Sequence, residues 1–304
     1  MGHTVILGAN GQLGSDLCRE WASADSAYTP LRHADIDVCD EEAVRRVLVS
    51  LQPKVVINTA AFHKVEACEE DPERAFAVNA FAVLQLARSC HALGIRLVHF
   101  STDYVFSGDA ARPYAESAAA RPVNAYGWSK ATGEYFLRRA CPEHLLIRTS
   151  GLFGIKGASG KGGNFVETML RLGQERGTVS VVTDQTLSPT YTRDLAVMVR
   201  RLIDDGATGT FHVTNSGACS WYEFAQAIFE RAGLSVAVVP ITTDQSGARV
   251  ARPGYSVLGS DRLQREGYGR LRSWREALTA YLSERAMGAS MEGQSEPVAE
   301  VVAS

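Results

Sequence analysis

A short apolar run that breaks into regularly spaced glycines constrains the fold of this chain more than any other feature. Residues 4–7 read Thr-Val-Ile-Leu, and Gly8, Gly11 and Gly14 follow at intervals of three as a helical pattern begins. Glycine lets the backbone turn sharply and approach a ligand closely, and the N-terminus of a helix favours an anion. The pattern predicts a strand, a tight turn and a helix that bind a dinucleotide pyrophosphate. A glycine-rich turn without a ligand is the alternative.

Apolar and amphipathic segments alternate through the first half of the chain. Residues 55–57, Val-Val-Ile, are apolar throughout, as in a strand of a parallel sheet that is buried on both faces. Repeated strand–helix–strand units predict an α/β fold with a doubly wound parallel sheet of the Rossmann type. The strands are expected at 4–7, 27–31, 55–57, 96–100 and 145–148, and the helices at 12–22, 40–51, 72–93 and 126–139.

The second half is less regular and predicts a smaller, partly interleaved C-terminal substrate domain. Residues 151–163 are rich in glycine and predict a mobile loop, after which Asn164 can cap a helix. Helices are also expected at 165–176, at 221–233 after the capping-box spacing of Ser220 and Glu223, and at 274–283, and strands at 179–182 and 211–213. The expected division assigns 1–150 and about 185–217 to the dinucleotide-binding domain, 151–184 and 218–286 to the substrate domain, and 287–304 to a disordered tail.

Composition excludes several classes of protein. The formal net charge of -3 gives no support for a nucleic-acid partner, and no apolar run is long enough to span a membrane. The six cysteines are dispersed without a C-x-x-C pair, so we expect neither a zinc ribbon nor a disulfide framework. The strand that begins at Thr4 leaves no room for a signal peptide, which predicts a cytoplasmic protein with reduced thiols. Trp21, Trp221 and Trp274 are expected in the core.

Two further segments indicate nicotinamide chemistry. Tyr126 and Lys130 are four residues apart and share one face of a helix. An ammonium beside a phenol lowers the pKa of the phenol and makes it a better proton donor. Thr102 lies just after the strand at 96–100, where parallel sheets bind ligands, and its hydroxyl can hold the substrate oxygen. Taken singly, the tyrosine–lysine pair fits a surface helix and the threonine fits a turn or a helix cap.

These segments resemble the extended short-chain dehydrogenase/reductases and, more narrowly, the dTDP-4-dehydrorhamnose reductase family. The resemblance extends from Thr4 to Trp274. The matching segments are 8–14, 58–61, 101–106, 126–130, 163–170, 182–185, 189–190, and 252–253 with Ser256.

The resemblance implies reduction of the C4 ketone of dTDP-4-dehydro-6-deoxy-L-mannose to dTDP-L-rhamnose, a precursor of cell-surface polysaccharide. It makes Tyr126 the proton donor, Thr102 its partner, and Lys130 the residue that binds the nicotinamide ribose. The implied cofactor residues are Gly8, Gly11, Gln12, Leu13, Gly14, Asp37, Val38, Ala61, Phe62, His63, Phe100, Tyr126 and Lys130. The implied substrate residues are Thr102, Asp103, Asn164 and Arg252, the last at the nucleotide diphosphate.

The second strand is followed by Arg32 rather than by an acidic residue. An arginine there can pair with a 2′-phosphate, which favours NADPH and still allows some use of NADH. Gly151 stands where some members of the family carry a tryptophan, so a reductase of another nucleotide-linked 4-ketosugar is one alternative. A non-catalytic, dinucleotide-binding regulatory subunit is another. Arg193 lies near an acidic position of the magnesium-bridged dimers in the family, which argues against metal-bridged pairing and leaves Mg²⁺ binding and a homodimer open.

Overall fold

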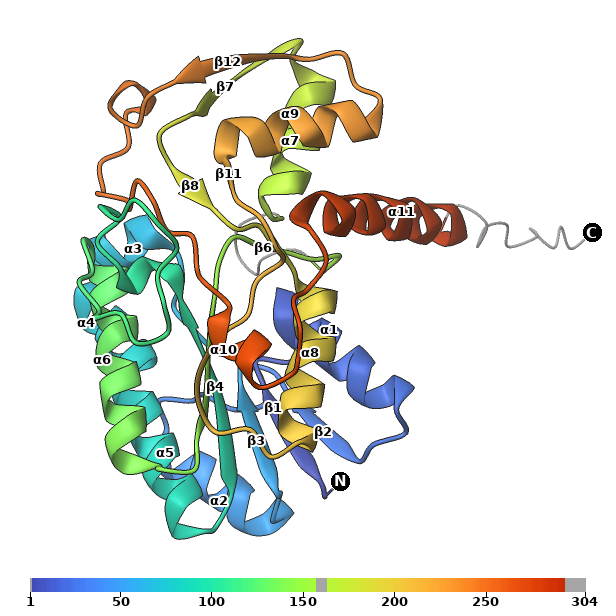
Figure 1. Ribbon diagram of the computed structural model, residues 1–304. Coiled ribbons are helices and arrows are strands. Elements are labelled where there is room, and N and C mark those ends of the chain that lie inside the picture. The colour runs from blue at the N-terminus through green and yellow to red at the C-terminus, as the bar shows by residue number, and fades with distance from the viewer. Residues whose placement is uncertain (1, 157–162, 293–304) are drawn as a thin grey trace, which may run out of the picture.

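A parallel sheet forms the centre of the molecule. The computed structural model describes residues 2–156 and 163–292. Among these residues, six strands pair in the order β10-β5-β4-β3-β1-β2, all parallel (Figure 1). This arrangement confirms the doubly wound α/β fold. The strands are β1 (Thr4–Leu7), β2 (Tyr28–Leu31), β3 (Val55–Asn58), β4 (Arg96–Thr102), β5 (Leu145–Thr149) and β10 (Gly209–His212).

Helices cover both faces of the sheet because successive strand residues point to opposite faces. Ile6 of β1 belongs to an apolar cluster with α1 (Gln12–Ser23) and α8 (Thr192–Asp204). Its neighbours Val5 and Leu7 belong to the cluster formed with α2 (Glu41–Leu51), α5 (Ala82–Ala92) and α6 (Ala125–Ala140). All four residues of β1 are therefore buried, as the unbroken apolar run predicts.

The predicted helix at 72–93 has an irregular middle. It consists of α4 (Pro72–Phe76), a π-helical turn η1 (Ala77–Phe81) and α5, and it ends at Gly94 with φ +64°. The short helix α3 (Val65–Glu70) precedes it and was not predicted. A π turn inserts an extra residue into a helix and frequently marks a functional site. Here it turns the side chain of Asn79 into the interior.

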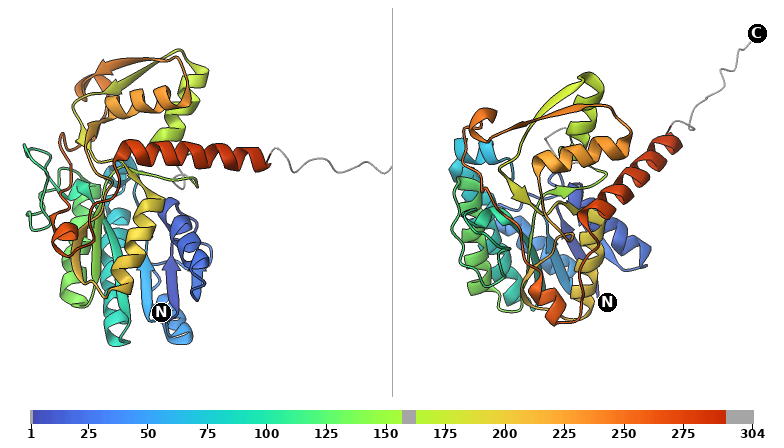
Figure 2. Two further views of the ribbon diagram at one scale, coloured as in Figure 1. Left: turned by 45° about the vertical axis from the view of Figure 1, so that its right-hand side comes forward. Right: turned by 45° about the horizontal axis from the view of Figure 1, so that its top comes forward.

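A smaller layer lies beyond the carboxyl ends of the strands, and Figure 2 shows it from two sides. Its apolar cluster draws on α7, α9, α11 and β7. The predicted caps are confirmed, since Asn164 caps α7 and Ser220 forms a capping box with Glu223 at α9. The elements are α7 (Phe165–Glu175), β7 (Thr178–Val182), α9 (Trp221–Ala232), β12 (Ala237–Ile241) and α11 (Trp274–Glu292).

Short elements connect the two layers. They are β6 (Leu152–Phe153), β8 (Thr186–Leu187), β9 (Thr190–Tyr191), β11 (Cys219–Ser220), α10 (Asp261–Arg265) and the 3₁₀ turns η2 (Asp103–Val105) and η3 (Asp244–Ser246). The strand β6 pairs with β9, so the predicted loop 151–163 was wrong at its start. Residues 157–162 of that loop lie outside the described residues.

One helix of the expected substrate segment packs on the sheet, and one predicted boundary, the start of the tail, needs correction. The side chain of Leu263 in α10 returns to the apolar cluster of the sheet, although it falls within the expected substrate segment 218–286. The helix α11 continues to Glu292, past residue 287 where the tail was expected to begin. Residues 293–304 lie outside the described part of the chain.

Candidate active site

The glycine turn joins β1 to α1 at the carboxyl edge of the sheet. Gly8 has φ +76°, which favours glycine, and its N–H donates to the Leu31 carbonyl at 2.9 Å. A Cβ atom on Gly14 would overlap the Gly8 carbonyl oxygen, so the helix packs on the turn only without one. Gly11 precedes the first turn of α1, where the N–H groups are free for an anion. The cradle fits a pyrophosphate.

The next two predicted cofactor residues lie in that first turn. Leu13 is buried in the core beneath the turn. Gln12 is half-buried, and its Oε1 atom has no hydrogen-bond partner among the described residues. An unpaired acceptor at the glycine turn is consistent with a ligand bound there.

The segment after β2 lies beside the glycine turn, because Gly8 and Ala9 both donate to the last carbonyl of β2. The side chain of Arg32 is exposed and forms an ion pair with Asp35 at 3.4 Å. Asp37 is exposed and accepts from the Cys39 N–H at 2.9 Å, whereas Val38 packs partly against the core. The Arg32 guanidinium is thus paired with Asp35 but remains exposed to solvent at this edge, where a phosphate can reach it.

The loop after β3 carries Ala61, Phe62 and His63, all half-buried. The buried Asn79 side chain fixes this loop by accepting from the Phe62 N–H at 2.9 Å and donating to the Phe62 carbonyl at 2.8 Å. Asn79 also donates to the Ser129 hydroxyl on α6 at 3.0 Å. No local sequence pattern pointed to Asn79, because its orientation depends on the π turn.

The helix α6 begins at its cap Asn124 and carries Tyr126 in its first turn. The Tyr126 phenol is in hydrogen-bonding contact with Thr102, and its ring lies edge-on to Tyr104 at 5.8 Å between centroids. Burial raises the pKa of the phenol, contact with Thr102 lowers it, and the nearby Asp103 carboxyl raises it again. The structure thus brings Thr102 and Tyr126 together.

Lys130 lies one helical turn further on and is buried. Its Nζ atom donates to the Phe100 carbonyl at 2.6 Å and lies 3.3 Å from His99 Nε2. Burial lowers the pKa of Lys130 to about 8, and the Glu134 carboxylate opposes this shift. The expected lowering of the Tyr126 pKa by Lys130 is wrong for this arrangement, because burial dominates at both groups.

Asp103 differs from its expected role. Its carboxyl is buried and accepts from the hydroxyls of Ser150 at 2.7 Å, Ser256 at 2.5 Å and Thr102 at 3.0 Å. Burial raises its pKa, and these hydrogen bonds lower it. Both carboxyl oxygens are already engaged, so Asp103 joins three segments of the chain rather than offering a free carboxylate to a sugar.

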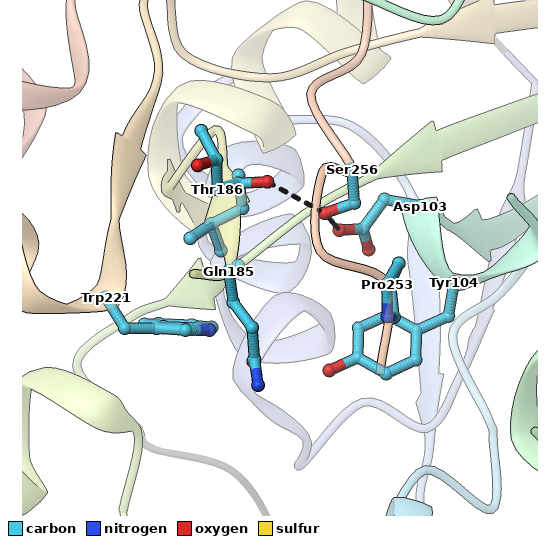
Figure 3. Close-up of a pocket in the computed structure, with 9 residues that line it drawn as sticks. Asp103, Tyr104, Gln185, Thr186, Trp221, Pro253 and Ser256 are labelled. Carbon is cyan, nitrogen blue, oxygen red and sulfur yellow. Dashed lines mark hydrogen bonds between the residues drawn. The ribbon is translucent and has the colours of Figure 1, made fainter. Parts of the chain in front are cut away.

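A pocket opens beside Asp103 between the two layers. Figure 3 shows Trp221 and Gln185 on one side of it and Tyr104 and Pro253 on the other. Trp221 packs against the core of the smaller layer, with its ring 4.5 Å from that of Phe165, but it is only half-buried and also lines the pocket, so the expected core position holds in part. Trp21 and Trp274 are buried as predicted. The remaining lining residues are Asp103, Gly151, Thr186, Leu187 and Ser256.

The two remaining substrate residues differ in position. Asn164 is buried away from the pocket, where it caps α7 through the Glu167 N–H and donates to the Gly154 carbonyl at 2.8 Å. Its hydrogen-bonding groups are used by the fold, so the structure does not bring it to the substrate. Arg252 is half-buried, forms an ion pair with Glu66 and reaches the Tyr104 hydroxyl beside the pocket.

The carboxylates near Arg193 are already engaged by other side chains of the same chain. Glu284 of α11 is paired with Arg19 and Tyr191, and Asp16 accepts from Thr192. Arginines thus neutralise carboxylates there, and the described residues contain no cluster of ligands that could hold a metal. Among the described helices, none has the length and apolar content that crossing a bilayer requires.

Comparison with known proteins agrees with this geometry. The family model for the RmlD substrate binding domain matches residues 2–287. The spore coat polysaccharide biosynthesis protein SpsK of Bacillus subtilis is 41% identical over 94% of this chain and 98% of its own length. The dTDP-4-dehydrorhamnose reductase of Mycolicibacterium smegmatis is 39% identical over 90% of this chain and 83% of its own.

Comparison with a solved structure indicates the same family. The crystal structure of dTDP-4-dehydrorhamnose reductase from Bacillus anthracis in complex with NADP has a TM-score of 0.89 and 39% identity. The match covers 93% of this chain and 99% of that one. The chain therefore belongs to the RmlD substrate binding domain family, that of the dTDP-4-dehydrorhamnose reductases among the extended short-chain dehydrogenase/reductases.

Proposed function

We propose that this protein reduces the C4 ketone of dTDP-4-dehydro-6-deoxy-L-mannose with NADPH and forms dTDP-L-rhamnose. The contact between Thr102 and Tyr126, with Lys130 one turn away, is the observation that carries this proposal. It lies at the carboxyl edge of the sheet where the glycine turn can hold a dinucleotide. Relatives named for this reaction support the choice of substrate.

When bound, the nicotinamide supplies a hydride to the ketone carbon. Tyr126 donates the proton to the developing alkoxide oxygen, and Thr102 orients that oxygen through a second hydrogen bond. Lys130 is fixed by the Phe100 carbonyl and would meet the nicotinamide ribose. Gly8, Gly11 and Gly14 would hold the pyrophosphate.

The roles proposed for the two arginines and for the segments of the chain depend only on where these residues lie. The exposed guanidinium of Arg32 suits a 2′-phosphate, and the NADP complex of the Bacillus anthracis relative supports NADPH. Arg252 is the proposed contact of the nucleotide diphosphate because it lies beside Tyr104 at the pocket. Segments 1–150 and about 185–217 would bind the cofactor, with 151–184 and 218–286 covering the substrate. A cytoplasmic location and a homodimer stay predictions.

A coupled assay tests the activity directly. The protein is supplied with dTDP-glucose, the upstream dehydratase and epimerase, and NADPH, and the sugar product is identified. Tyr126→Phe should lower turnover by about 10²- to 10⁴-fold, because it removes the proton donor, while NADPH affinity stays unchanged. Near-normal turnover of this variant would refute the role of Tyr126.

A reductase of another nucleotide-linked 4-ketosugar is the second candidate. Gly151 has φ +54° and adds no side chain to the pocket, whereas Trp221 lines it from α9. This combination can change which sugar fits without changing the chemistry at Tyr126. Omitting the epimerase from the coupled assay separates the candidates, because oxidation of NADPH would then report reduction of the unepimerised ketosugar.

A further inference from the structure

Two buried groups beside Lys130 have no part in the mechanism described above. His99 lies on β4 beneath the lysine, with its Nε2 atom 3.3 Å from Lys130 Nζ. Glu134 follows Lys130 by one turn on the same face of α6 and is fully buried. Burying a polar group costs free energy unless the group is hydrogen-bonded or paired. The contacts that His99 and Glu134 make around Lys130 therefore need a physical explanation.

Hydrogen bonding determines which nitrogen of His99 carries the proton. The Asn58 Oδ1 atom accepts from the Ala60 N–H at 3.1 Å, which directs the Asn58 amide nitrogen toward His99 Nδ1 at 3.3 Å. An amide nitrogen can only donate, so Nδ1 is the acceptor and the ring proton is on Nε2. Burial also lowers the pKa of His99 far below its usual value, so the ring is neutral.

This tautomer fits the amine form of Lys130. An Nε2–H group that faces Lys130 Nζ needs a lone pair there, and only the uncharged amine has one. The same nitrogen can still donate to the Phe100 carbonyl at 2.6 Å. With an ammonium group, His99 would have to move its proton to Nδ1 and lose the hydrogen bond from Asn58.

Glu134 favours the ammonium form of Lys130, which is opposite to the effect of His99. Its carboxylate accepts from Arg148 Nε at 2.8 Å and Nη2 at 2.7 Å, and from Arg138 Nη2 at 2.8 Å. These pairs hold Glu134 ionised, with a lowered pKa. A fixed negative charge one helical turn from Lys130 favours the ammonium form.

We propose that His99 and Glu134 are positioning residues that set the proton affinity of Lys130 from opposite sides. His99 favours the amine and Glu134 favours the ammonium, so the lysine can gain or lose its proton near neutral pH. The relevance of this balance to turnover rests on the proposed function. The elements around the lysine carry other titratable groups, among them Tyr126, Tyr135, Arg138 and Arg139 on α6, Arg96 on β4, Asp103 and Tyr104 in η2, Arg148 on β5, and Glu66, Cys68, Glu69 and Glu70 on α3, with His144 close to His99.

Titration of the cofactor-free protein by NMR tests the proposal. The chain has five lysines, so protein grown with ¹³C-labelled lysine gives few Cε signals, and Lys130→Arg identifies the one that belongs to Lys130. The wild-type midpoint should lie near 8. His99→Gln supplies an amide oxygen as acceptor and should raise the midpoint by about 0.5 pH unit or more. Glu134→Gln should lower it by a similar amount, and Glu134→Asp should restore it.

His144→Gln is the matched control. His144 is also buried, but it bonds to the Cys141 carbonyl rather than to Lys130, so the midpoint should move by less than about 0.2 pH unit. The proposal is overturned if the Lys130 midpoint shifts equally in His99→Gln and His144→Gln, or if it does not shift in His99→Gln. If Glu134→Gln does not fold because Arg148 is left unpaired, His99→Gln decides alone.

The pH profile of ketone reduction separates this inference from the proposed function. An active wild-type enzyme whose variants keep the wild-type lysine midpoint contradicts the roles of His99 and Glu134. Opposite shifts of that midpoint in a protein that reduces no ketosugar would support the inference and contradict the proposed function. In the active enzyme, the alkaline limb of kcat/KM should move in the same direction as the NMR midpoint.

Discussion

Replacing Asp103 with alanine distinguishes a structural role from a substrate ligand. The change leaves the hydroxyls of Thr102, Ser150 and Ser256 without their buried acceptor. Each hydrogen bond to a charged group contributes about 1.5–3 kcal/mol. Burial of the carboxyl offsets part of this gain, as its raised pKa indicates. We expect Asp103→Ala to lower the free energy of unfolding by about 3 kcal/mol at neutral pH.

The pH dependence of that loss has a definite sign. Burial raises the folded-state pKa of Asp103 above its ordinary value of 3.8. Asp103 therefore makes its full contribution to the free energy of unfolding when the pH is below its unfolded-state pKa. That contribution is lost as the pH rises through its folded-state pKa. The difference in unfolding free energy between wild type and Asp103→Ala should be larger at about pH 4 than at about pH 8.

Urea unfolding followed by circular dichroism measures both effects. Ser256→Ala should lower the unfolding free energy by about 1 kcal/mol in the wild type. In the Asp103→Ala background it should have almost no effect, because the hydrogen bond is already lost. Unchanged stability of Asp103→Ala, together with a large rise in KM for the nucleotide sugar, would contradict this reasoning and restore Asp103 as a direct ligand.

Two further variants test the proposed binding residues. Arg32→Ala should weaken NADPH binding by about tenfold and leave NADH binding unchanged, because only NADPH carries the 2′-phosphate. Cofactor fluorescence measures both affinities. If the variant and the wild type prefer NADPH over NADH to the same degree, Arg32 is not the cause of the preference. Arg252→Gln should raise KM for the nucleotide sugar by about tenfold with little change in kcat, because the diphosphate of the substrate loses a charged partner. An unchanged KM in steady-state assays would exclude a contact between Arg252 and the diphosphate.

Local patterns were sufficient to predict most of the fold. The glycine turn, the capping box at Ser220 and the cap at Asn164 depend on residues within a few positions of one another, and all of them are confirmed. The carboxyl ends of parallel strands meet at one edge, which explains why Thr102 and Tyr126 could be expected to meet.

Features that depend on tertiary partners could not be predicted from such patterns. Asn79 is oriented by a π turn that its neighbours in sequence do not reveal. Asp103 was expected at the sugar because nothing near it in sequence shows that Ser256 will reach it across 153 positions. Trp221 was assigned to the core on size, yet its place at the start of α9 directs it into the pocket.

The environment of Tyr126 keeps its phenol protonated, which is the state that ketone reduction requires. Burial raises the pKa of its phenol, so the residue keeps its proton at neutral pH. An alkoxide is a stronger base than a phenolate, and it can therefore take that proton as the carbonyl oxygen gains negative charge. Oxidation of an alcohol would need the phenolate as a base, which burial beside the Asp103 carboxyl disfavours. A buried tyrosine that bonds to Thr102 thus enters the reaction carrying the proton that the new alcohol oxygen needs.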